Sequence, residues 1–262
     1  MERRTGTVGD ADITRSEIDL IVLAAPRWAA HVASEVVARL RSEPQLRLCL
    51  PTGDTPAPLY AALADALGDP VTAQGATIGG ATIVLLDEYV GLAADDPARC
   101  DNQLRHDLIE RLAQQPAAVQ HIRVDELAPP EAAAAHDEVA ARGIDLAIVG
   151  LGLNGHVGFN EPGSTADSPT RVVTLAAESI AVSQAEYGAA SVPRMGVTLG
   201  LARLLEAGEI WLLVTGAHKS DILRHALREP ESADVPASFL RRHPRLTVFA
   251  DEAAAADLRG AG

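Results

Sequence analysis

Mostly apolar runs of four to six residues alternate along the chain with longer stretches of helical periodicity. The runs predict buried strands at 18–23, 46–50, 81–86, 144–149, 209–214 and 246–249. The intervening stretches are rich in Ala, Leu, Glu and Arg, and they predict helices at 27–40, 56–67, 102–112, 130–141, 219–227 and 251–258.

Strands that are separated by helices favour parallel pairing, because each connection then crosses back along the sheet. We therefore expect an α/β fold: a doubly wound, mostly parallel, Rossmann-like sheet with helices on both faces. Residues 1–262 are expected to form a single domain, with a lid in the irregular stretch within residues 162–191. Ligands of such sheets bind at the carboxyl ends of the strands, so the residues directly after each run are the candidates for chemistry.

Composition and charge narrow the classes of function. Acidic residues outnumber basic ones 36 to 22, and the formal net charge of −14 would repel nucleic acids and anionic membranes. Aromatic residues make up 3% of the chain, and no apolar run reaches the roughly 20 residues that span a bilayer. Two cysteines are too few for a disulfide scaffold, and no Cys/His spacing predicts a metal site. We expect a cytoplasmic protein that acts on a small molecule, with no nucleic-acid or membrane partner.

The first candidate junction is the segment 50–56 (LPTGDTP), which follows a predicted strand. Gly53 permits a tight turn, Thr55 is a good helix N-cap, and Pro56 suits the first helical position. The start of such a helix can bind an anion, but an ordinary capped helix explains the same residues. Asp54 would repel a phosphate bound there.

The second junction carries two adjacent carboxylates, Asp87 and Glu88, directly after the run 81–86. A partly desolvated carboxylate at a strand end can act as a general base, because burial raises its pKa toward neutrality. The pair is equally consistent with solvated acids in a turn.

The third junction, within 148–163 (IVGLGLNGHVGFNEPG), contains the densest set of special residues. Its glycines match the dinucleotide-binding pattern G-x-G-x-x-G, but Gly158 and Pro162 would end the long helix that such a site requires. Close approach of the backbone to a small ligand explains the glycines better. His156 and Glu161 then supply a titrating pair at a strand end, although a lone histidine is more often structural.

Lys219 is the only lysine in the chain, and it follows the run 209–214 and a short turn. A cation at a helix N-terminus is unfavourable to the helix dipole, so an anion nearby would explain it. The alternative is an ordinary surface lysine on the first turn of a helix.

Together, the segments 51–56, 86–92, 150–163 and 216–219 resemble the glucosamine-6-phosphate deaminase family in order and spacing, over almost the whole chain. The most specific pieces are the run DEY at 87–89 and GHVGFNEPG at 155–163. The related 6-phosphogluconolactonases share the sheet and a glycine-histidine pair but lack the FNEP continuation. The resemblance implies conversion of a hexosamine 6-phosphate, with glucosamine 6-phosphate expected, to a ketose 6-phosphate and ammonia.

The resemblance also implies a role for each matching residue. An imidazole opens the sugar ring, and a carboxylate moves a proton between C2 and C1. The expected catalytic residues are Asp87 as the base, His156 oriented by Glu161 for ring opening, and Asn154, which stands where some members have aspartate. The expected substrate-binding residues are Thr52, Gly53, Thr55 and Lys219. Because proton transfer does this work, neither a metal nor another cofactor is expected.

The chain departs from the family at the phosphate. Asp54 stands where the family has glycine or serine, and the arginine of the family's lid has no counterpart within 179–187; Arg194 is a candidate replacement. Only part of the allosteric site of hexameric members is matched, so regulation by an amino sugar is not expected.

Two other functions stay open. One is hydrolysis of a sugar lactone, as in the 6-phosphogluconolactonases, and the other is binding of a sugar phosphate without turnover. The amino-sugar isomer and the formation of a homo-oligomer are also open. The deaminase hypothesis requires that Asp87 and His156 face one cavity.

Overall fold

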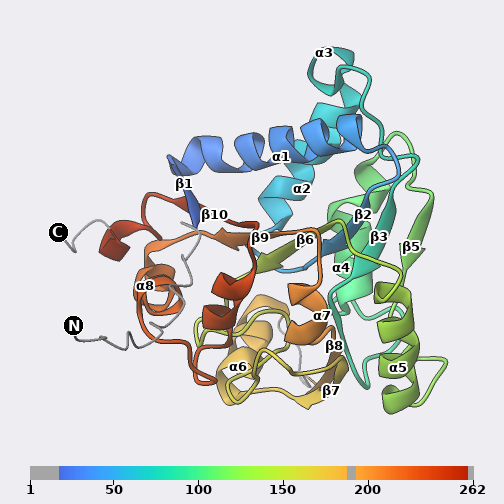
Figure 1. Ribbon diagram of the computed structural model, residues 1–262. Helices are drawn as coiled ribbons and strands as arrows, with labels where there is room; N and C mark the ends of the chain where they lie inside the picture. The colour runs from blue at the N-terminus through green and yellow to red at the C-terminus, as the bar shows by residue number, and fades with distance from the viewer. Residues whose placement is uncertain (1–17, 188–192, 259–262) are drawn as a thin grey trace, which may run out of the picture.

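The computed structural model describes residues 18–187 and 193–258. Its centre is a seven-stranded parallel sheet with the strand order β1-β10-β9-β6-β2-β3-β5 (Figure 1). The strands are β1 (Asp19–Leu23), β2 (Arg47–Leu50), β3 (Thr82–Leu85), β5 (Ala118–Gln120), β6 (Leu146–Gly150), β9 (Glu209–Val214) and β10 (Leu246–Asp251). Every predicted run forms a strand, and the prediction of a mostly parallel α/β sheet is confirmed.

The central strands are mostly apolar because both faces of the sheet are covered. Successive side chains alternate between two cores: Ile148 joins the first, whereas Ala147 and Val149 join the second. The first core includes residues of α1 (Ala25–Ser42), α2 (Ala57–Gly68) and α4 (Cys100–Asp107). The second includes residues of α7 (Leu201–Leu205), α8 (Ser220–Arg228) and the 3-10 helix η3 (Pro236–Arg242). In Figure 1, α1 and α2 lie above the sheet and α7 and α8 below it. Helix α5 (Pro129–Ala140) contributes to both cores.

A second, antiparallel sheet was not predicted. It has the order β4-β8-β7 and consists of β4 (Asp87–Tyr89), β8 (Met195–Thr198) and β7 (Arg171–Thr174). It begins where β3 ends, and the amide of Leu199 donates to the carbonyl of Leu86 at 2.9 Å. The segment 162–191, expected as a lid, contains β7 and α6 (Ala177–Tyr187), and its residues 188–191 lie outside the described part of the chain.

Two predicted helices differ from the structure. The expected helix 102–112 is divided into α4 and the 3-10 turn η1 (Ile109–Arg111). The expected helix 251–258 is wrong: β10 runs through Asp251, and only a 3-10 turn, η4 (Ala256–Leu258), follows. The carboxylate of Asp251 accepts from the amides of Ala254 (2.7 Å) and Gly216 (3.0 Å), which fixes a turn instead of a helix. The short elements α3 (Pro70–Ala73) and η2 (Ala217–Lys219) complete the list.

The strand order creates a crevice between β2 and β6. After β2 the chain continues to β3 and β5 on one side, and after β6 it continues to β9 and β10 on the other. Because the connections leave these neighbouring strands in opposite directions, the loops at their carboxyl ends diverge and leave room for a ligand.

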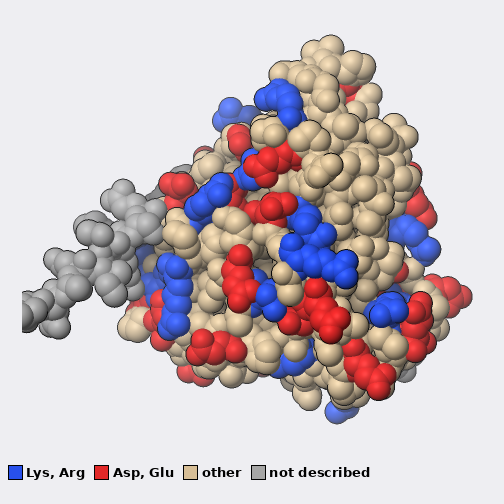
Figure 2. Space-filling view, turned by 45° about the vertical axis from the view of Figure 1, so that its right-hand side comes forward, with Lys and Arg blue, Asp and Glu red and all other residues tan. Residues whose placement is uncertain are grey.

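The face in Figure 2 carries acidic and basic side chains intermingled, with no large field of one sign. Every helix within the two described ranges is too short or too polar to cross a membrane.

Candidate active site

A cavity of about 320 Å³ opens at the carboxyl ends of four adjacent strands, β3, β2, β6 and β9. The loop after each strand contributes to its walls, and so do the first turns of α4 and α6. The residues predicted for catalysis and binding that line it are Thr52, Gly53, Thr55, Asp87, Asn154, His156 and Lys219. Glu161 is not among the lining residues, but it contacts two of them.

Asp87 is the first residue of β4, pairs with Thr198 of β8, and is 6% exposed. Burial and the nearby charge of Glu88 raise the pKa of Asp87 from 3.8 to about 7, although a hydrogen bond from Cys100 acts in the opposite direction. A carboxyl with this pKa can both accept and return a proton near neutral pH.

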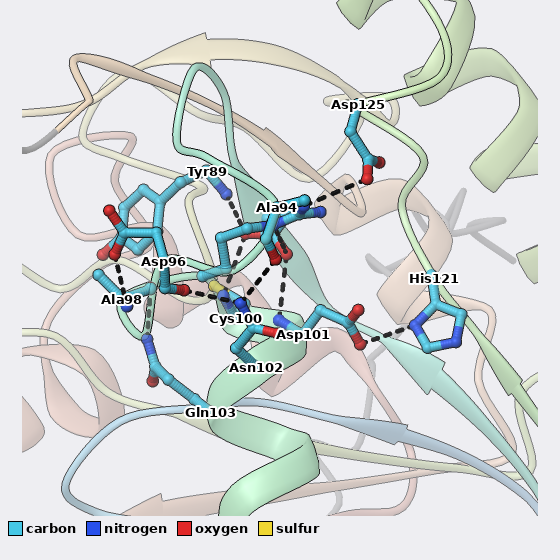
Figure 3. A network of polar contacts seen from close by, with 12 residues as sticks. Tyr89, Ala94, Asp96, Ala98, Cys100, Asp101, Asn102, Gln103, His121 and Asp125 are labelled. Atoms are coloured by element: carbon cyan, nitrogen blue, oxygen red, sulfur yellow. Dashed lines mark hydrogen bonds and ion pairs between the residues drawn. The ribbon is translucent and has the colours of Figure 1, made fainter.

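Glu88 does not line the cavity, because side chains alternate along β4 and Glu88 lies on the face opposite Asp87. It is fully buried, and its carboxylate accepts from the amides of Tyr89 (2.7 Å), Cys100 (3.0 Å) and Asp101 (3.0 Å) (Figure 3). The Arg99 guanidinium lies 3.4 Å from it. Glu88 therefore ties β4 to the first turn of α4, as an N-cap supplied from a distant part of the chain.

His156, Asn154 and Glu161 form one hydrogen-bonded group in the loop after β6. The Asn154 amide group donates to Glu161 Oε2 at 2.9 Å, so its oxygen Oδ1 faces His156 Nδ1 at 2.7 Å. Glu161 Oε2 itself lies 3.5 Å from Nδ1. This arrangement assigns the proton of the neutral imidazole to Nδ1 and leaves Nε2 as the basic nitrogen. The predicted orientation of His156 by Glu161 thus operates mainly through Asn154.

Glu161 stays ionised in this group. Burial acts to raise its pKa, but hydrogen bonds and charge from His156, with further bonds from Ser179 and Asn154, lower the pKa to about 2. The amide of Ala176 also approaches Glu161, at 3.3 Å. The carboxylate therefore links the loop after β6 to the start of α6.

Glycines set the position of the imidazole. A Cβ atom at Gly152 would lie 2.2 to 2.4 Å from the ring atoms of His156, so only glycine lets the ring rest on this part of the loop. Gly158 has φ +55°, and a Cβ atom there would lie 3.1 Å from Asp87 Oδ2. At these two positions, glycine permits the close approach of the backbone to the side chains of His156 and Asp87.

The rest of the loop is held by buried polar contacts. Asn160 is fully buried and donates to the carbonyls of Val157 (3.0 Å) and Leu199 (2.8 Å). Arg171 of β7 donates to Asn160 Oδ1 (3.1 Å) and to the hydroxyl of Ser164 (2.8 Å). The second sheet therefore fixes the loop that carries His156.

Lys219 lines the cavity next to the turn 52–56. Its Nζ donates to the Thr55 hydroxyl at 3.0 Å. Thr55 was predicted as the N-cap of the helix, but the residue at that position is Pro56, directly before α2. The Thr55 hydroxyl therefore does not cap the helix and accepts the hydrogen bond from Lys219. Gly53 has φ +103°, which explains the glycine in the turn. Among the described lining residues, Lys219 is the only lysine or arginine. Asp54 also lines the cavity, but its side chain is exposed. Arg194, the candidate replacement for the lid arginine, is exposed and does not line the cavity.

Several lining residues were missed from the sequence. Cys100 and Gln103 enter from α4, and Glu178 and Ser179 from α6. The Ser179 hydroxyl lies 3.2 Å from His156 Nδ1. No local pattern marks these positions, because the second sheet and Glu88 bring the two helices to the cavity. Within the described part of the chain, no cluster of His, Cys, Asp and Glu side chains could hold a metal ion.

Comparison with known proteins agrees with this architecture. The family described as glucosamine-6-phosphate isomerases/6-phosphogluconolactonase matches residues 22–248. A glucosamine-6-phosphate deaminase of Rhodopirellula baltica is 40% identical over 233 residues, which cover 87% of this chain and 90% of that protein.

Solved structures show the same fold. A monomeric glucosamine-6-phosphate deaminase superposes with a TM-score of 0.85 at 27% identity, covering 92% of this chain and all of that one. A 6-phosphogluconolactonase of Trypanosoma cruzi superposes with a TM-score of 0.72 at 21% identity, covering 94% of this chain and 98% of that one. The lactonase likeness concerns the fold alone. The resemblance seen in the motifs is confirmed, and the chain belongs to the glucosamine-6-phosphate isomerase/6-phosphogluconolactonase family.

Proposed function

We propose that the protein is an isomerising deaminase that converts glucosamine 6-phosphate and water to fructose 6-phosphate and ammonia. The observation that carries the proposal is that Asp87, which follows β3, and His156, which follows β6, line the same cavity. The pKa of Asp87 is about 7, and the imidazole of His156 is held in one orientation. The deaminase relatives, one of which is 40% identical, support this reaction over lactone hydrolysis.

His156 opens the sugar ring in this proposal. With its Nδ1 proton held by Asn154 Oδ1, the imidazole uses Nε2 to move a proton between the anomeric hydroxyl and the ring oxygen. Glu161 stabilises the imidazolium that forms while Nε2 carries the proton, since its own low pKa keeps it ionised. The product of this step is the open-chain aldehyde.

Asp87 then performs the isomerisation. Its carboxylate removes the proton from C2 of the open-chain amino aldose while the substrate's own ammonium group gives a proton to the C1 oxygen, so an enolamine forms. The protonated carboxyl of Asp87 then gives its proton to C1. The resulting C2 iminium adds water and releases ammonia, and the C2 ketone of the product forms. The base leaves this sequence in its starting protonation state, as a catalyst must.

We assign the phosphate to the part of the cavity that is lined by the turn 52–56 and Lys219. Lys219 supplies a positive charge, and the hydroxyls of Thr52 and Thr55 with the backbone at Gly53 supply hydrogen-bonding groups. Because the Asp54 side chain is exposed, water and salt screen its repulsion of a bound phosphate.

The first turn of α6, which carries Glu178 and Ser179, is proposed to cover the site as the lid. A cytoplasmic setting belongs to the same proposal and is supported by the two cysteines, which are free thiols.

The test is direct turnover. Purified protein is incubated with glucosamine 6-phosphate, and ammonia and fructose 6-phosphate are measured separately. Equal amounts of both products from the wild type, with none from Asp87→Asn, are expected. Turnover no faster in the wild type than in Asp87→Asn would refute the assignment.

The lactonase alternative is separated by a second substrate. If the protein were a lactonase, 6-phosphogluconolactone hydrolysis would exceed the spontaneous rate, survive Asp87→Asn and fail in His156→Ala. Stabilisation by glucosamine 6-phosphate without either product would instead identify a binding protein.

A further inference from the structure

A second cavity lies beside the proposed active site and shares no described lining residue with it. Its volume is about 470 Å³, and its walls come from the end of the edge strand β5, the loop that follows β5, helix α5 and the start of α4. Cys100 lines the first cavity, whereas its two neighbours in the chain, Arg99 and Asp101, line the second. The start of α4 is therefore a wall between the two cavities.

The guanidinium of Arg99 is buried in this wall with one edge unpaired. Arg99 is 5% exposed, and its Nε donates to Glu88 Oε2 at 3.4 Å and its Nη1 to Asp125 Oδ2 at 3.3 Å. Both contacts are longer than the roughly 2.7–2.9 Å of a strong charge-assisted bond. Nη2 has no hydrogen bond to a described residue. It is not sealed from water, because the fully buried side-chain atom without a partner in the described ranges is His136 Nδ1. The free edge of this guanidinium can therefore accept a carboxylate ligand.

His136 of α5 adds an unpaired acceptor to the same cavity. It lines the cavity, is 2% exposed, and its Nε2 lies 2.7 Å from the carbonyl oxygen of Leu85. A carbonyl only accepts, so Nε2 carries the ring proton, and burial lowers the pKa of His136 and keeps the ring neutral. Nδ1 is then a buried acceptor that has no partner among the described groups. Because buried polar atoms nearly always have a partner, this acceptor indicates a ligand with an N–H or O–H donor.

The charges around the second cavity favour a ligand that carries both signs. Three carboxylates and three basic side chains line it in pairs: Asp101 with His121 at 2.7 Å (Figure 3), Asp125 with Arg99 at 3.3 Å, and Glu126 with Arg123 at 3.6 Å. The carboxylates would repel a simple anion, and the guanidinium groups would repel a simple cation. A zwitterion can place each of its charges beside the opposite charge of the wall.

We propose that the second cavity binds a small zwitterion of the amino-acid class, with its carboxylate on the free edge of the Arg99 guanidinium and its ammonium group toward His136 and the carboxylates of the wall. The volume lies within the roughly 300–1,000 Å³ of small-molecule sites. The inference does not depend on the reaction proposed for the first cavity, because the two cavities have separate linings.

Direct binding with matched probes tests the ligand class. Each of the twenty standard L-amino acids is titrated at millimolar concentration into the purified protein and followed by isothermal titration calorimetry. At least one is expected to bind saturably, at one site per chain. Its analogue without the amino group and its analogue without the carboxylate are each expected to bind about 10-fold more weakly or worse. Saturable binding of none of the amino acids, or equal affinity for either analogue, would overturn the proposal.

Three substitutions test the place of binding. Ala135 is half-buried and lines the second cavity, whereas its neighbour Ala134 is exposed and does not. Ala135→Leu fills part of the cavity and is expected to weaken binding about 10-fold or more, while the matched control Ala134→Leu leaves it unchanged. Arg99→Lys keeps the charge but loses the planar fork, and a similar loss is expected. If Arg99→Lys does not fold, the two alanine variants decide. Equal affinities in Ala135→Leu and Ala134→Leu would overturn the proposal.

A fourth variant separates the two cavities. Lys219→Met changes the first cavity alone, since Lys219 does not line the second. Binding of the amino acid is expected to be the same in Lys219→Met and in the wild type, whether or not the protein turns over glucosamine 6-phosphate. Loss of binding in Lys219→Met would place the ligand in the first cavity and overturn the proposal. Failure of the turnover test with intact amino-acid binding would overturn the proposed function alone.

Discussion

Asp87→Asn is expected to inactivate the enzyme and to stabilise its fold at neutral and alkaline pH. In the folded protein the pKa of Asp87 is about 7 instead of 3.8, because the carboxylate is buried near Glu88. Each pKa unit corresponds to about 1.4 kcal/mol, so ionised Asp87 lowers the free energy of unfolding by about 4 kcal/mol above pH 7. An uncharged asparagine of the same shape removes this term.

The sign follows from the protonation of the two states. Below pH 3.8 the carboxyl is neutral in both the folded and unfolded chains, and its ionisation has no effect on stability. Between about pH 4 and pH 7 the unfolded chain ionises first, so the wild type loses stability as the pH rises. The advantage of Asp87→Asn should therefore grow from about 1 kcal/mol near pH 4.5 to about 4 kcal/mol near pH 8.

Urea unfolding followed by circular dichroism at several values of pH measures this difference. The informative quantity is the change in the free-energy difference between the two proteins, because constant effects of the substitution cancel. The negative charge of Glu88 is one cause of the raised pKa of Asp87. Ionisation of Glu88 therefore adds to the loss of stability of the wild type as the pH rises. A difference that stays constant between pH 4.5 and pH 8 would show that Asp87 has an ordinary pKa and that its burial does not prepare it as a base.

Three further outcomes are expected. Gly152→Ala should lower kcat about 100-fold with little change in Tm, because the new Cβ displaces the His156 ring; normal kinetics would contradict the reading of the loop. Lys219→Met should raise KM for glucosamine 6-phosphate about 10- to 100-fold and Lys219→Arg less, while an unchanged KM in both would move the phosphate elsewhere. Glu161→Gln should lower kcat at every pH above about 4, because Glu161 is ionised throughout that range. The acid limb of the pH profile should stay where it is in the wild type. A shift of that limb would assign it to Glu161 instead of Asp87.

The central sheet was predictable because its signal is local. A strand buried on both faces must be mostly apolar along its length, and β6 (Leu146–Gly150) shows this without any knowledge of its neighbours. β5 (Ala118–Gln120) and β4 (Asp87–Tyr89) have only three residues each, which is too short for a pattern. The alanine-rich segment 251–258 misled in the opposite direction, because its helix propensity is weaker than the side-chain contacts of Asp251.

The residues of the candidate site were predictable only where they follow an apolar run in the sequence. Asp87, His156 and Lys219 each come soon after an apolar run, and the topology brings those ends together. Cys100 and Ser179 reach the cavity from the first turns of helices that the second sheet and Glu88 put in place. Their contribution depends on contacts between distant segments, for which one sequence contains no periodic signal.

The pairing of β1 with β10 has a consequence for the order of folding. Asp19 lies opposite Thr247, more than two hundred residues later in the chain. During synthesis β1 cannot pair with β10 until all of the other strands have left the ribosome, and closing so long a loop is slow. The strands that frame the cavity, by contrast, are all made before β10. The edge of the sheet far from β5 should therefore be the last part to become protected from hydrogen exchange in a newly made molecule.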